Sequence, residues 1–69
     1  MTKIDARGLS CPEPLILLRQ AMKTEEDSYE MLVDNHASKE NALRFAEHQG
    51  YCAQIAEEAG VYTLIISRK

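Results

Sequence analysis

Two prolines, Pro12 and Pro14, stand directly before the apolar run Leu15-Ile16-Leu17-Leu18, and they constrain the fold of this chain more than any other feature. Proline is tolerated in the first turn of a helix, because the N–H that it lacks would have no partner within the helix. The prolines therefore predict that a helix begins close to Pro12. Cys11 then lies at or next to the N-cap, where unpaired N–H groups and the positive end of the helix dipole favour a thiolate over a thiol.

The reactivity of Cys11 depends on the charges around this helix start. A free cysteine has a pKa of about 8.5, and a helix end lowers such a pKa by up to about 1.5 units. Glu13 in the first turn works against this shift, whereas Arg7 and Arg19 would support it if they fold nearby. We interpret Cys11 as a reactive thiol, because a purely structural cysteine would not need two prolines to fix its presentation. The alternative is a small buried apolar side chain.

Apolar periodicity predicts six elements along the chain. Strands are expected at residues 3–6, 29–33, 51–58 and 61–67, and helices at about 12–23 and 38–49. Residues 7–10 are expected to be the loop that presents Cys11, and residues 34–37 a second loop. Ala59 and Gly60 are expected to form a hairpin turn between the last two strands.

Side-chain spacing predicts which residues face the core. The second strand directs Tyr29, Met31 and Val33 to one side. The apolar stripes of the two helices are Leu15, Leu18 and Met22 in the first, and Ala42, Phe45 and Ala46, with Gln49 at the end, in the second. Ser38 is expected to be the N-cap of the second helix, and Gly50 is expected to end it.

The element order βαβαββ predicts an α/β fold, a two-layer sandwich in which two helices cover one face of a four-stranded sheet, because each helix has a single apolar stripe to bury. Connections through a helix favour parallel pairing of the first two strands. The 69 residues allow one domain, spanning residues 1–69. Since so small a domain buries only about 60% of the surface of its unfolded chain, its function must lie near the surface.

Charge and composition exclude several classes of protein. The formal net charge is −3, with 11 acidic and 8 basic residues, which argues against a nucleic-acid-binding surface. No apolar run approaches the length of about 20 residues that spans a membrane, and the N-terminus lacks the basic-then-apolar pattern of a signal peptide. We therefore expect a cytoplasmic protein.

The remaining residues with reactive or metal-binding side chains are Cys52, His36 and His48. Two cysteines make neither a disulfide scaffold nor a zinc site at the usual spacing. Cys52 falls on the more polar face of its predicted strand and is interpreted as an ordinary strand residue; the alternative is a resolving thiol close to Cys11 in space. Both histidines are interpreted as solvated surface side chains, so no metal site is predicted.

The run Asp5-Ala6-Arg7-Gly8-Leu9-Ser10-Cys11-Pro12-Glu13-Pro14, followed by an apolar helix, resembles the TusA/SirA-like family of small sulfur carrier proteins. The hallmark of that family is Cys-Pro-x-Pro at the start of the first helix, and the resemblance covers essentially the whole chain. The second half, with Val33-Asp34-Asn35, residues 40–46 and Gly50-Tyr51, is most similar to the TusA-like domain of YedF-type proteins, which are associated with selenium metabolism. The resemblance implies a mixed sheet whose last strand is antiparallel to the rest.

The resemblance also implies a persulfide relay on Cys11 that needs no cofactor. A cysteine desulfurase or a rhodanese-like protein would donate the sulfur, and an acceptor protein would receive it, as in tRNA thiolation, cofactor metabolism or selenium metabolism. The residues expected to support the helix start are Gly8, Pro12, Glu13 and Pro14. Arg7 and Arg19 are candidates for docking a partner or stabilising the anion. Two other functions stay open: a thiol-based regulatory or interaction module without sulfur transfer, and a nucleic-acid-binding domain, which the acidic balance disfavours.

Overall fold

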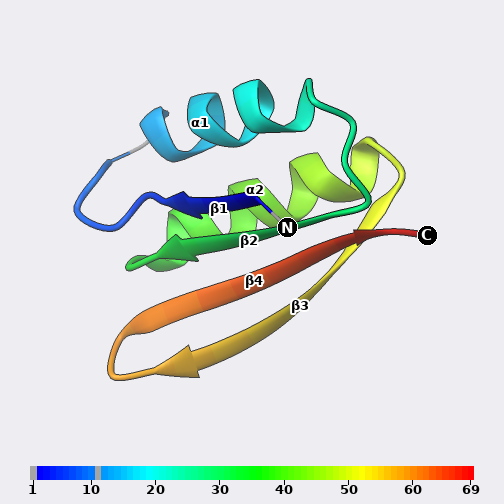
Figure 1. Ribbon diagram of the computed structural model, residues 1–69. Coiled ribbons are helices and arrows are strands. Elements are labelled where there is room, and N and C mark those ends of the chain that lie inside the picture. Colours follow the sequence, from blue (N-terminus) through cyan, green and yellow to red (C-terminus); the bar gives the residue numbers. More distant parts are fainter. Residues whose placement is uncertain (1, 11) are drawn as a thin grey trace.

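The computed structural model describes residues 2–10 and 12–69 of the chain. Its elements are β1 (Thr2–Asp5), α1 (Glu13–Met22), β2 (Ser28–Val33), α2 (His36–His48), β3 (Tyr51–Glu58) and β4 (Val61–Arg68) (Figure 1). The predicted order βαβαββ is confirmed. The bounds agree with the prediction to within one residue, except at the start of α2.

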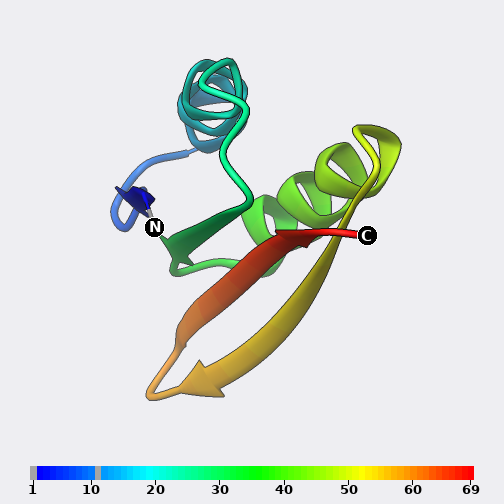
Figure 2. The ribbon, with the colours of Figure 1, turned by 45° about the vertical axis from the view of Figure 1, so that its right-hand side comes forward.

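The four strands form one mixed sheet in the order β1-β2-β4-β3. β1 and β2 are parallel, as expected for strands that a helix connects, and β4 is antiparallel to both of its neighbours, β2 and β3. The expectation that the last strand runs against the others is confirmed. The two helices lie on the same side of the sheet, so the molecule has one helical layer and one strand layer (Figure 2).

The core lies between these two layers. Alternate residues of β2, namely Tyr29, Met31 and Val33, are fully buried, as their spacing predicts, and they pack with Leu64 and Ile66 of the neighbouring β4. Burial of a side chain of this size contributes on the order of 2 kcal/mol. The paired strands and the helices above them are thus held by one contiguous apolar cluster.

The helix stripes differ from the prediction in two places. In α1 the buried residues are Pro14, Leu18 and Met22, which follow one another at intervals of four, while Leu15 is only partly buried. In α2 the small residues Ala42 and Ala46 are buried, and Phe45 is partly buried against the core.

The end of α2 also differs in part from the expectation. Gln49 is exposed, because it is the C-cap and no longer follows the helical stripe. Gly50 follows with a φ of +85°, and its N–H donates to the carbonyl of Glu47, so it ends the helix as predicted.

The prediction that Ser38 caps α2 is wrong, and so is the assignment of residues 36 and 37 to a loop. Asn35 is the N-cap, with an extended backbone and an Oδ1 that accepts a hydrogen bond from the Ser38 N–H at 2.8 Å. Asparagine and serine are both strong N-caps, and the choice of Asn35 adds one turn to the helix. Ser38 becomes the third helical residue, and its side chain is buried.

The hairpin turn at Ala59 and Gly60 is confirmed. Both residues have a left-handed backbone, with φ values of 53° and 82°. Two consecutive positive φ values define a type I′ turn, whose twist matches that of the flanking strands. β3 and β4 are therefore paired along their whole length, from Glu58 opposite Val61 to Tyr51 opposite Arg68.

Candidate functional site

The start of α1 follows directly after Cys11 in the sequence. Pro12 is the N-cap residue, with φ −99° and ψ 11°, and Pro14 stands in the first turn with its ring buried. No side chain of the described residues caps this helix end. The prediction that a helix begins close to Pro12 is confirmed, and the supporting role of the two prolines for the thiol stays a prediction. Cys11 itself lies outside the described residues, so its placement stays a prediction.

The residues on both sides of Cys11 are exposed to solvent. Ser10 precedes it and Pro12 and Glu13 follow it, and all three are exposed. The Glu13 N–H donates to the Ser10 carbonyl at 3.0 Å, which links the described residues on the two sides of this position. The described segments beside Cys11 therefore belong to the surface of the molecule, at the positive end of the α1 dipole.

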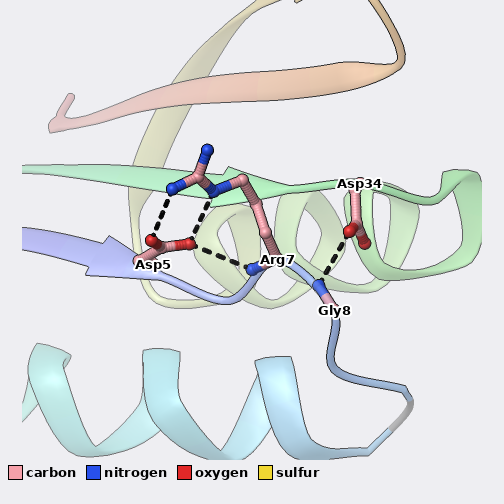
Figure 3. Close-up of polar contacts among 4 residues, drawn as sticks. All are labelled: Asp5, Arg7, Gly8 and Asp34. Carbon is pink, nitrogen blue, oxygen red and sulfur yellow. Dashed lines mark hydrogen bonds and ion pairs between the residues drawn. The ribbon is translucent and has the colours of Figure 1, made fainter.

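The loop that leads to Cys11 is fastened to the sheet at Gly8. The Gly8 N–H donates to Oδ2 of Asp34 at 2.7 Å (Figure 3). Gly8 has a φ of +78°, in the left-handed region that favours glycine. This bond joins the segment after β1 to the residue directly after β2.

Asp34 is a residue that sequence reasoning did not assign to the site. The signal for it was present, because Asp34 follows the second of two strands predicted to be parallel. The carboxyl ends of adjacent parallel strands lie at the same edge of a sheet, which brings Asp34 close to the loop after β1.

Arg7 forms a bidentate ion pair with Asp5. Its Nε donates to Oδ1 at 2.9 Å and its Nη2 to Oδ2 at 2.8 Å, while the Arg7 backbone N–H also donates to Oδ1 (Figure 3). The hydrogen bonds from Arg7 lower the pKa of Asp5 from 3.8 to about 2, and the carboxylate in turn raises the pKa of Arg7. Asp5 alternates with the buried Ile4 and Ala6, so this pair lies on the sheet face turned away from the helices.

Arg19 lies at the other end of α1. It stands in the last turn of the helix, six residues after Glu13, which corresponds to about 9 Å along the axis. There it lines a surface groove of about 400 Å³ together with Met22, Lys23, Glu25, Phe45 and Gln49. The structure therefore does not bring Arg7 and Arg19 together, and each would act at a different place on the surface.

Cys52 is an exposed residue of β3, and its Sγ lies 3.8 Å from Oγ of Ser67 on β4. β3 and β1 form opposite edges of the sheet. His36 is the first residue of α2 and not a loop residue, and His48 is the last; both are exposed, as predicted. Within residues 2–10 and 12–69, no group of three or more His, Cys, Asp or Glu side chains is arranged to hold a metal ion.

Comparisons with known proteins agree with this architecture. The sequence pattern of the family described as "Sulfurtransferase TusA" matches residues 2–68. The chain is 34% identical over 71 residues to "Putative sulfur carrier protein MJ0990" of Methanocaldococcus jannaschii, which covers 100% of this chain and 95% of that protein. The crystal structure of a SirA-like protein from Desulfitobacterium hafniense superposes with a TM-score of 0.88 at 32% identity, covering 97% of this chain and 96% of the other.

The fold and the site thus define a class of protein, a two-layer βαβαββ domain whose first helix begins at a pair of prolines. The chain belongs to the TusA sulfurtransferase family. None of the helices in the described part of the chain has the length and apolar character needed to cross a membrane.

Proposed function

We propose that this protein carries sulfur as a persulfide on Cys11 and passes it to an acceptor protein. The Cys11 thiolate attacks the terminal sulfur of a donor persulfide, so that a bond forms between the two sulfur atoms and the donor's own sulfur–sulfur bond breaks. The donor leaves as a thiolate, and Cys11 now bears the sulfane sulfur. An acceptor nucleophile then removes that sulfur and returns Cys11 to its thiolate form.

The observation that carries this proposal is the start of α1 directly after Cys11. The helix end has no side-chain cap among the described residues, and Pro12 occupies the N-cap position. The positive end of the helix dipole therefore remains available to an anion beside the thiol. A thiolate and a persulfide are both anions, so the same helix end favours the nucleophile and its loaded product.

The neighbouring residues have supporting roles in this proposal. Gly8 and the Asp34 carboxylate fasten the loop before Cys11, and Pro12 and Pro14 fix the helix start after it. Glu13 is an exposed carboxylate in the first turn, where it limits how far the pKa of the thiol falls. Together these residues would hold the thiol at the surface without a deep pocket.

The proposed partners are proteins on both sides of the transfer. A cysteine desulfurase or a rhodanese-like protein is the proposed donor, and a second protein is the acceptor. Arg7 and Arg19 are proposed to dock acidic surfaces of these partners or to stabilise the anion. The proposed destinations of the sulfur are tRNA thiolation, cofactor metabolism and selenium metabolism, the last of which rests on the resemblance of the second half of the chain to YedF-type proteins.

Intact-mass measurement tests the proposal. The protein is incubated with a cysteine desulfurase and free cysteine, and its mass is compared with that of Cys11→Ser and Cys52→Ser variants treated alike. We expect the wild type and Cys52→Ser to gain sulfur atoms and Cys11→Ser to gain none. Equal loading of Cys11→Ser, or no loading of the wild type, would contradict the carrier function and favour a thiol-based interaction module.

A further inference from the structure

The outer edge of β3 is the longest unpaired strand edge in the described part of the chain. β3 stands last in the order β1-β2-β4-β3 and contains eight residues, whereas the opposite edge strand, β1, contains four. Natural edge strands are commonly protected by proline, lysine, bulges or short length. β3 has no proline, lysine or bulge and pairs with β4 without interruption, and its only charged residues, Glu57 and Glu58, lie at the end next to the hairpin turn.

The helical layer covers only the beginning of β3. Tyr51 is buried and Ala53 is partly buried, but every residue from Gln54 to the turn is exposed. Ile55 is 39% exposed and, with Ile16 on α1, is one of the two exposed large apolar side chains of the described residues. It lies on the helical side of the sheet, beside the buried Leu64 of β4. The middle of the free edge thus presents an apolar side chain to solvent.

Charges of opposite sign lie beside the two ends of β3. Glu57 and Glu58 form its acidic end, next to the hairpin turn. At the other end, Arg68 of β4 lies opposite Tyr51, with its guanidinium 5.4 Å from the centre of that ring, and Lys69 donates its N–H to the Gly50 carbonyl. An antiparallel pair of identical β3 strands would therefore place the acidic end of each copy beside the basic end of the other.

We propose that the β3 edge binds a second copy of this chain, in an antiparallel pair that joins the two sheets into one of eight strands. A two-fold axis perpendicular to the sheet makes the contact self-complementary, with both helical layers on the same side. Residues directly opposite each other in the two β3 strands then have their side chains on the same face of the joined sheet. The register that buries most apolar surface places Ile55 of one copy opposite Ile55 of the other, at the two-fold axis. In this register Ala53 lies opposite Glu57. This inference is independent of the sulfur-carrier proposal.

The pairing register brings the charged ends within reach of each other. Glu57 of one copy lies opposite Ala53 of the other, so it is two strands across and two residues along from Arg68, about 12 Å between Cα atoms, a gap that a glutamate and an arginine side chain can span together. Arg68 has a side chain 46% exposed, beside its ion pair with Asp27 at 3.3 Å. The dimer is therefore expected to weaken as the salt concentration rises.

Sedimentation velocity over about 10 µM to about 1 mM protein tests the proposal, because association confined to one strand edge is expected to have a dissociation constant in this range. Ile55→Lys places two ammonium groups at the axis and is expected to raise that constant by about tenfold or more. Ile16→Lys changes the other exposed isoleucine in the same way and is the matched control, which should leave dimerisation unchanged. A wild-type protein that stays monomeric throughout, or equal dissociation by both variants, would overturn the proposal.

Disulfide trapping tests the register separately. In a Cys11→Ser, Cys52→Ser background, Ile55→Cys should form a covalent dimer when oxidised glutathione is added, because the two thiols meet at the axis, and glutathione is reduced as they are oxidised. Ile16→Cys in the same background should not. Circular dichroism establishes that each variant is folded. Failure of Ile55→Cys to cross-link, or equal cross-linking of Ile16→Cys, would overturn the proposed pair.

Discussion

At the scale of single residues, a hydrogen bond between distant segments fastens the loop before Cys11 at Gly8. The Gly8 N–H and the Asp34 carboxylate are separated by 26 residues in sequence and by 2.7 Å in space. We expect Asp34→Ala to lower the free energy of unfolding by about 0.5–1.5 kcal/mol, because the N–H loses its acceptor. Asp34→Asn keeps an acceptor oxygen and should lose less. Urea unfolding of the two variants measures this, and an Asp34→Ala protein as stable as the wild type would show that the bond does not hold the loop.

The Arg7–Asp5 pair makes stability depend on pH in the acid range. The pKa of Asp5 is lowered to about 2 in the folded protein, so the folded state favours the ionised carboxylate. The stabilisation is present above the unfolded value near pH 4 and is lost as the pH falls from about 4 to about 2. Glu26, whose pKa is lowered chiefly by the hydrogen bond from the Thr2 hydroxyl, adds to the same trend.

Asp5→Asn is expected to make the urea midpoint less sensitive to pH in that window, because the amide does not titrate. The pH dependence of the urea midpoint that remains in this variant comes from Glu26 and other carboxylates. Arg7→Gln should have the same flattening effect, since it removes the partner that lowers the pKa of Asp5. Unchanged pH dependence in both variants would show that this pair does not govern acid stability.

At the scale of elements, one residue of the turn limits the stability of the β3–β4 hairpin. Ala59 has a φ of 53°, a left-handed backbone that alanine adopts at a cost and that asparagine and glycine adopt readily. We expect Ala59→Asn to raise the free energy of unfolding by about 0.5–1 kcal/mol, since Asn-Gly is the preferred type I′ pair. Thermal unfolding monitored by circular dichroism measures the change. A lower melting temperature for Ala59→Asn would contradict the turn geometry.

The elements also show how far the sequence determines the fold. Alternating Tyr29, Met31 and Val33, the two prolines before α1 and the Ala59-Gly60 turn each carry a local signal, and these predictions are confirmed. The N-cap of α2 was predicted three residues late, because Asn35 and Ser38 are equally good caps in sequence. In the structure Asn35 is the cap, since its Oδ1 accepts the Ser38 N–H.

The candidate site was less predictable than the elements, because its contacts cross the chain. The sequence places Arg7 and Arg19 on either side of Cys11, but the structure binds Arg7 to Asp5 and sets Arg19 at the far end of α1. Asp34 reaches the loop through the parallel pairing of β1 and β2, which the helical connection predicts but which was not used to assign Asp34 to the site. Closeness to Cys11 in the sequence therefore did not indicate which side chains contact the loop before it.

At the scale of the whole molecule, the layout leaves little room for an enclosed site. The helical layer covers one sheet face, the core fills the space between the layers, and the described residues beside Cys11 are at the surface. Such a layout agrees with the proposed transfer of sulfur between proteins, in which a donor and an acceptor would reach the thiol in turn. The free β3 edge lies at the opposite side of the sheet from β1, so self-association would leave the segment after β1 accessible.

The account rests on the thiol of Cys11 being activated by the start of α1. The most direct measurement is the rate of alkylation of Cys11 by iodoacetamide as a function of pH, followed by peptide mass spectrometry, with Cys52 as the internal control. The helix end predicts that Cys11 titrates below the free-cysteine value of about 8.5, by up to about 1.5 units, and reacts faster than Cys52 at neutral pH. A Cys11 thiol that titrates at or above that value and reacts no faster than Cys52 would contradict the account.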